Sequence, residues 1–154
     1  MTKPTENLKK LNLDIPKAQD PLGSYVAHKK VGSLVFISGQ ISIDRNGNIT
    51  KGKVGADLSV EEAQEAAKLC AINIISQIRA ACKGDLDKVK NCVKICGFVN
   101  SSSNFYDQPK VLNKASELLQ KVFDESGKHT RAAVGVSSLP LNAAVEIDAI
   151  FEIN

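Results

Sequence analysis

Segments with strand-like patterns outnumber helical ones in this 154-residue chain, and that imbalance limits the folds open to it. The hydrophobic pattern predicts three strands, a helix, a strand, a second helix and two closing strands. Two helices can cover only one face of so wide a sheet, which predicts an α+β fold with both helices on the same side. The other face is not polar enough to be left in water, so we expect a homo-oligomer to bury it.

Both helical segments carry an apolar stripe at three- and four-residue spacing. The first begins at Ser59, which forms a capping-box pattern with Glu62, and ends before Gly84. The second begins near Gln108, has Pro109 at its first position and ends at Gly127. The stripes are Ala63, Ala67, Cys70, Ile74, Ile78 and Ala81 in the first, and Val111, Ala115, Leu118, Leu119 and Val122 in the second. We assign both stripes to the core.

Six shorter runs are predicted to be strands. The first three are Tyr25 to Val31, the apolar run Leu34 to Ile37, and Ile41 to Ile43; the last three are Val89 to Val99, Arg131 to Ser137 and Val145 to Ile153. Ser38-Gly39-Gln40 is expected to end the second strand, and Asn46-Gly47 is a preferred pair for a tight hairpin turn. In the fourth run, strict alternation puts Val93 on the face of Ile95, and Cys92 on the opposite face with Cys96 and Phe98.

The N-terminal 20 residues differ in character from the rest of the chain. They are polar, lack periodicity and contain Pro4 and Pro16, so we expect an extended arm over residues 1–20 followed by a single domain over residues 21–154. No stretch approaches the ~20 apolar residues of a membrane-spanning helix. Residues 1–11 lack the apolar segment of a signal peptide.

The cysteines and histidines indicate neither a disulfide nor a metal site. Cys92 and Cys96 would lie ~13 Å apart on a strand, and Cys70 and Cys82 ~18 Å apart on a helix, whereas a disulfide needs Cα atoms within ~7 Å. The two histidines, His28 and His129, have no metal-ligand spacing. We therefore expect reduced thiols in a cytosolic protein, with neither a disulfide nor a zinc site.

Charge and aromatic content argue against nucleic acid as a partner. The net charge is +3 with scattered basic residues, and the chain has two Tyr, five Phe and no Trp. Such a chain offers few stacking platforms for single-stranded RNA. Dinucleotide-binding and P-loop glycine motifs are absent, as is the Gly-x-Ser-x-Gly elbow of esterases.

One arginine and three carboxylates are candidate chemical groups. Arg131 begins a strand on which its same-face neighbours Ala133, Gly135 and Ser137 are small, so a carboxylate could reach its planar fork. The alternative is an ordinary salt bridge. Glu146, Asp148 and Glu152 share one face of the last strand, with neighbours ~6.6 Å apart. One of them could activate water as a general base, and the alternative is pairing with Lys90 and Lys94.

Two further positions could line a cleft. Tyr25 follows a Gly-Ser turn, and its phenol could cover a ligand and donate a hydrogen bond, or lie half-buried at a rim. Ser38-Gly39-Gln40 offers backbone groups at a strand end.

In their order along the chain, these segments resemble the Rid (YjgF) family, also known as L-PSP endoribonuclease-like proteins. The resemblance runs from Gly23 to Glu152. Its residues are Gly23-Ser24-Tyr25, Val31 to Ile41, Gly84 to Val89, Asn113, Thr130 to Val134, Leu139-Pro140 and Val145 to Ile147. It implies a chorismate mutase-like fold, with a six-stranded mixed sheet, two helices on one face, and a homotrimer with clefts between subunits.

The deaminase branch of that family hydrolyses reactive enamine and imine intermediates, such as 2-aminoacrylate, to a 2-keto acid and ammonia. The resemblance implies that Arg131 holds the carboxylate of a small metabolite and Glu146 positions or activates water. It further implies that Tyr25 closes the cleft, that Ser38, Gly39 and Asn113 line it, and that Ala133 takes a place where the branch has a small residue or Cys. No cofactor is implied. Ala132 and Ala133 after Arg131, and Val26 after Tyr25, depart from the usual pattern.

Two other functions remain open from the sequence. A non-catalytic binder of small carboxylates would use Arg131 without any water geometry. A ribonuclease, as the older family label suggests, fits poorly because no His-based acid–base pair and no interleaved basic and aromatic residues are present.

Overall fold

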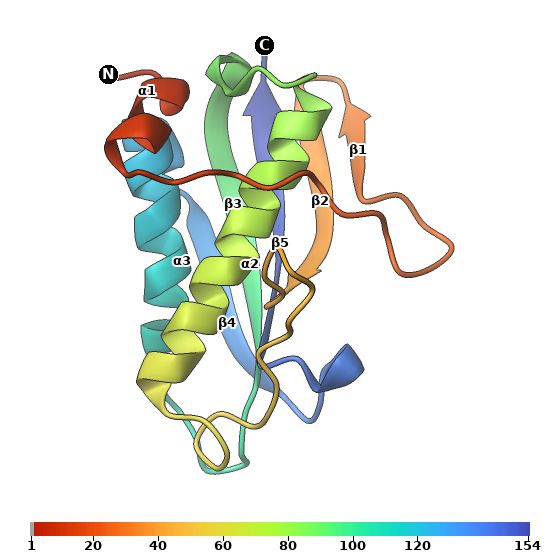
Figure 1. The fold of residues 1–154 in the computed structure, drawn as a ribbon, viewed down its shortest axis with the longest axis vertical. Coiled ribbons are helices and arrows are strands. Elements are labelled where there is room, and N and C mark those ends of the chain that lie inside the picture. The colour runs from red at the N-terminus through yellow and green to blue at the C-terminus, as the bar shows by residue number, and fades with distance from the viewer. Residues whose placement is uncertain (1) are drawn as a thin grey trace.

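The computed structural model describes residues 2–154 and contains a five-stranded sheet with helices packed on one face (Figure 1). The strands are β1 (His28–Val31), β2 (Leu34–Ile41), β3 (Val89–Asn100), β4 (Thr130–Val136) and β5 (Val145–Ile153). Their order across the sheet is β1-β2-β5-β3-β4. Only the β3–β4 pair is parallel, so the sheet is mixed and the α+β prediction is confirmed.

Three α-helices accompany the sheet: α1 (Pro4–Lys10), α2 (Val60–Ala81) and α3 (Gln108–Phe123). Ser59 and Glu62 form the predicted capping box of α2, with each side chain bonded to the other residue's backbone N–H. The end of α3 differs from the prediction, because Asp124, with a φ of 51°, breaks the helix before Gly127. Three short 3₁₀ turns complete the chain: η1 (Leu86–Lys88), η2 (Asp124–Gly127) and η3 (Pro140–Asn142).

The prediction of six strands is wrong by one. Ser38-Gly39-Gln40 does not end the second strand; instead β2 continues through it to Ile41, with a register shift against β5 between Ile37 and Gln40. A β-bulge thus replaces the expected strand end. The expected strand at Ile41 to Ile43 is therefore the end of β2 followed by a single bridge, Ile43 with Ile49.

Irregular pairing also changes the faces of β3. The β3–β5 register shifts between Val89 and Asn91 and again between Cys92 and Lys94, which interrupts strict alternation. Cys92 is consequently buried in the core and Val93 is exposed, the reverse of the prediction. All four cysteines are free thiols, as expected.

The N-terminal arm is not simply extended. Residues 4–10 form α1, which packs against α3 through Leu8 and a hydrogen bond from Asn7 Nδ2 to the Val122 carbonyl. The chain then crosses over α2 toward β1 (Figure 1). Arg79 of α2 holds that crossing segment by donating to the carbonyls of Ile15 and Pro16 at 2.8 and 3.0 Å.

The two faces of the sheet differ in what covers them. Side chains such as Val35, Ile95 and Phe151 pack under α2 and α3 and are fully buried. No helix covers the opposite face, where Phe36 and Val134 are 44% and 46% exposed. None of the helices within residues 2–154 has the length and apolar character to cross a membrane.

Candidate functional site

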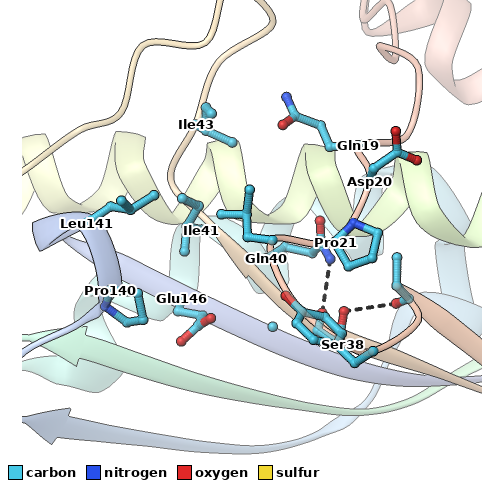
Figure 2. A pocket seen from close by; sticks show the side chains of 14 residues that line it. Gln19, Asp20, Pro21, Ser38, Gln40, Ile41, Ile43, Pro140, Leu141 and Glu146 are labelled. Carbon is cyan, nitrogen blue, oxygen red and sulfur yellow. Dashed lines mark hydrogen bonds between the residues drawn. The ribbon is translucent and has the colours of Figure 1, made fainter.

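A cavity of about 340 Å³ lies beside the C-terminal half of β2, which is not paired with β1. The ladder between β1 and β2 ends at His28 and Ile37, so one edge of β2 beyond that point is open to the preceding loop. Tyr25, Ser38, Gly39 and Glu146 all line this cavity, together with the walls shown in Figure 2. Four of the seven residues predicted for the site are therefore brought together.

Glu146 and Gly39 are in direct contact within the cavity. A Cβ placed on Gly39 would lie 2.5 Å from Glu146 Oε1, so any larger residue would displace the carboxylate. Burial, and secondarily the charge of Asp148, raises the pKa of the Glu146 carboxyl above its ordinary value. A carboxylate with a raised pKa in a cleft is a better proton acceptor near neutral pH and is a candidate general base.

The rest of the cavity is mostly apolar and closes over the carboxylate from two sides. Pro21 comes from the segment before β1, and Pro140 and Leu141 from η3 (Figure 2). Leu22, next to Pro21, also lines the cavity. Ser38 has its hydroxyl committed to the Ala27 carbonyl at 3.0 Å, so its side chain fixes the loop.

A second cluster surrounds Arg131 on the edge strand β4. Arg131 Nη1 donates to Asn113 Oδ1 at 2.9 Å and to Ser116 Oγ at 3.2 Å, and Nη2 donates to the Pro109 carbonyl at 3.4 Å. All three partners are neutral and belong to α3. Within residues 2–154 no ion pair includes Arg131, so its charge has no carboxylate partner there.

His129 also belongs to this cluster and was not predicted from the sequence. Its Nε2 lies 2.9 Å from Ser116 Oγ and its Nδ1 lies 2.6 Å from the Gly127 carbonyl, which can only accept. His129 therefore carries its proton on Nδ1, and the Ser116 hydroxyl donates to Nε2 while accepting from Arg131. Burial, opposed by the Gly127 bond, lowers the pKa of His129, and the Arg131 charge lowers it further. The sequence signal was present, since His129 lies two residues before Arg131.

The two clusters do not meet within one chain. Arg131 points to the helix side of β4, whereas Glu146 alternates with the buried Val145 and Ile147 and so lies on the opposite face of the sheet. Two strand spacings, roughly 10 Å, separate β5, which carries Glu146, from β4, which carries Arg131. Ala133, two residues after Arg131 on β4, is partly buried and packs against the core.

No group of His, Cys, Asp and Glu suited to hold a metal ion occurs in the part of the chain that the structure describes. The chemistry available to the two clusters is thus a guanidinium held ready for an anion, and a buried carboxylate that can take a proton.

Comparison with known proteins places this chain in a family. Residues 6–153 match the family profile described as "YjgF/chorismate_mutase-like, putative endoribonuclease". The chain belongs to the YjgF family. The resemblance drawn from the sequence is therefore confirmed, as is the chorismate mutase-like fold.

Curated relatives in this family carry different names. Protein TCP17 of Trypanosoma cruzi is 46% identical over 149 residues, 96% of this chain and 92% of the relative. A protein of Dermatophagoides farinae named 2-iminobutanoate/2-iminopropanoate deaminase is 30% identical over 139 residues, 90% of this chain and 92% of the relative.

Solved structures of the family fall into two degrees of similarity. The Agrobacterium tumefaciens protein Atu1372, described as having unknown function, has a TM-score of 0.91 at 44% identity, with 98% of this chain and 92% of that chain covered. Escherichia coli TdcF with bound serine has a TM-score of 0.64 at 26% identity, with 90% and 94% covered. The family thus includes named imine deaminases, which resemble this chain less closely than Atu1372 does.

Proposed function

We propose that this protein hydrolyses reactive enamine and imine intermediates of small amino acids to a 2-keto acid and ammonia. The observation that carries the proposal is the pair of complementary groups, Arg131 without a carboxylate partner and Glu146 with a raised pKa in an apolar cavity. Relatives at about 30% identity named as imine deaminases support the same reaction.

The reaction asks little of the protein because an imine carbon is already electrophilic. Arg131 holds the substrate carboxylate through two parallel hydrogen bonds. Glu146 takes a proton from water as the oxygen adds to the imine carbon, and passes it to the nitrogen. The hydroxyl proton of the resulting carbinolamine follows by the same route as the carbon–oxygen double bond forms and ammonia leaves. One water is consumed, the carbon–nitrogen bond breaks and a carbon–oxygen double bond forms, so no oxidant or cofactor is needed.

The proposed site is shared between subunits of a homotrimer. Arg131, Asn113 and Ala133 come from one subunit, and Tyr25, Ser38, Gly39 and Glu146 come from its neighbour. The separation of the clusters within one chain and the uncovered apolar sheet face support this assembly. The apolar cavity wall then receives the substrate side chain.

The test is the turnover of 2-iminobutanoate, generated in the assay from threonine by a dehydratase. Arg131→Ala is expected to lower kcat/KM by about 100-fold or more, because two charge-assisted hydrogen bonds are lost. Arg45→Ala is the matched control, since Arg45 contacts only the exposed Asp14. Wild-type turnover by the Arg131→Ala variant would discard the mechanism.

A carboxylate binder without catalysis is the second candidate. It would use the Arg131 guanidinium, whose hydrogen-bond partners are all neutral, and would need no water geometry at Glu146. Glu146→Gln separates the two functions. A binder keeps its affinity for 2-ketobutyrate in that variant and shows no turnover even as wild type, whereas the hydrolase loses turnover and keeps the ligand.

A further inference from the structure

A second cavity, of about 670 Å³, lies at the C-terminal end of β4 and shares no lining residue with the Glu146 cavity. The segment that follows β3 forms one wall, the end of β4 forms the floor, and Lys53 enters from the loop before α2. Its polar lining includes Lys53, Ser101, Ser102, Ser103, Gln108 and Ser137. The proposed hydrolysis leaves this cavity without a role.

Lys53 is a cation whose partners are all neutral. Its Nζ donates to Asn100 Oδ1 at 2.9 Å and to the Ser137 carbonyl. An ammonium has three donors, so one remains for a further acceptor. No ion pair described in residues 2–154 includes Lys53, and Asp57, the nearby acid, binds its backbone N–H rather than its ammonium.

Other donors surround the same space. Ser101, Ser102 and Ser103 line one wall, where the Ser102 hydroxyl donates to Asn104 Oδ1 at 3.1 Å. The hydroxyls of Ser101 and Ser103 can turn to donate to an anion. The first turn of α3 begins at Gln108, which also lines the cavity, and the preceding Asp107 makes no side-chain cap.

Gly135 keeps the floor of the cavity open. A Cβ at this position would lie 2.6 Å from Ser101 Oγ and 2.8 Å from Gln108 Nε2. The strand thus has no side chain at the point where the serine wall and α3 approach each other. An anionic group can reach the donors of both elements from above this glycine.

We infer that this cavity binds an oxyanion group, a phosphate or a carboxylate, through Lys53 and the hydroxyls of Ser101 and Ser103. The site is distinct from the Arg131 cluster, although both lie on the helix side of β4. Arg131 reaches the Pro109 carbonyl and Lys53 lies beyond Gln108, so the two cations flank the start of α3. This inference holds whether or not the protein hydrolyses imines.

The experiment titrates the full-length protein with inorganic phosphate, and separately with acetate, at constant ionic strength. Backbone amide NMR shifts of residues 101–108 and 135–137 report on the site. We expect saturable shifts with at least one anion, and a loss of affinity of at least about 10-fold in Lys53→Gln. Lys51→Gln is the matched control, because Lys51 is an exposed neighbour outside the cavity.

Two further variants separate a ligand site from a structural lysine. Gly135→Val fills the floor without removing any bond of Lys53, so it should also weaken binding, while Arg45→Ala, whose side chain lies outside the cavity, should leave it unchanged. Tighter binding of phosphate identifies a phosphoryl group, and tighter binding of acetate a carboxylate. The inference is overturned if neither anion gives saturable shifts, or if Lys53→Gln and Gly135→Val bind as the wild type does.

Discussion

Two effects raise the pKa of Glu146. The largest influence is burial in the cavity, and the second is the negative charge of Asp148, two residues along β5. Replacing Asp148 with Asn removes the charge and keeps the shape. The pKa of Glu146 should therefore fall toward its ordinary value in Asp148→Asn, without reaching it because burial remains. The change can be measured by ¹³C NMR titration of the Glu146 carboxyl.

Glu152→Gln provides the control for that titration, because Glu152 lies on the same strand but does not contribute to the Glu146 shift. An unchanged Glu146 titration in Asp148→Asn would contradict the electrostatic explanation. In turnover assays the same shift would move the acid limb of the pH profile to lower pH, since Glu146 must be ionised to accept a proton.

His129 titrates in the opposite sense and gives a separate prediction. Its pKa is lowered in the folded protein, so the unfolded chain binds more protons just below pH ~6.5. The free energy of unfolding should therefore decrease as pH falls from about 6.5 toward the folded pKa. Well above pH ~6.5, His129 is neutral in both states and should not affect the free energy of unfolding. His129→Asn should remove this part of the slope in urea denaturation curves measured at several pH values. An identical slope in wild type and variant would show that His129 is not responsible.

At the scale of secondary structure, the segment crossing α2 is held by few groups. Arg79 donates to the carbonyls of Ile15 and Pro16, and Gln77 donates to the Gln19 carbonyl at 2.8 Å. This segment leads into residues 19–22, which line the Glu146 cavity. The position of this cavity wall therefore depends on hydrogen bonds that α2 donates to the segment.

Arg79→Met keeps the aliphatic stem and removes both charge-assisted hydrogen bonds. We expect faster amide hydrogen exchange over residues 13–22, corresponding to a local loss of about 1.5–3 kcal/mol, with protection in the centre of α2 retained. Lys110→Met, at an exposed lysine of α3, is the control. Wild-type exchange over residues 13–22 in Arg79→Met would show that Arg79 does not hold the segment.

Local sequence rules predicted the elements that depend on local interactions. The capping box at Ser59 and Glu62 needs only four consecutive residues, and it is present as expected. Bulges depend instead on the partner strand, so the continuation of β2 through Gly39 and the exchanged faces of Cys92 and Val93 were not predictable from one segment. Likewise α1 is stabilised by packing on α3, which a polar, aperiodic stretch does not reveal.

The same distinction between local and tertiary interactions applies to the residues of the candidate site. The sequence named Glu146, Gly39, Ser38 and Tyr25, and the fold brings these four to one cavity. Whether Arg131, Asn113 and Ala133 join them remains a prediction, because their cluster lies on another edge of the chain. His129 was missed because a role in orienting Arg131 through Ser116 depends on the approach of α3 to β4, a tertiary contact.

At the scale of the whole molecule, the uncovered sheet face and the separation of the two clusters both favour an oligomer. The uncovered face of the sheet exposes Phe36, Val93 and Val134, which favours burial against other copies of the chain. The Arg131 and Glu146 clusters lie on opposite faces of one chain, on two strands that are separated by β3. A homotrimer in which each cleft takes one cluster from each of two neighbours would satisfy both observations.

Mixing two inactive variants tests this shared site directly. Arg131→Ala and Glu146→Gln should each form inactive trimers, because every cleft lacks one group. After the two are unfolded together and refolded at equal amounts, chains assemble at random. About one quarter of the clefts should then combine an intact Arg131 with an intact neighbouring Glu146, so turnover should return to about one quarter of the wild-type value. Refolded single variants are the controls. A mixture that stays inactive, while light scattering shows trimers, would contradict a cleft shared between subunits.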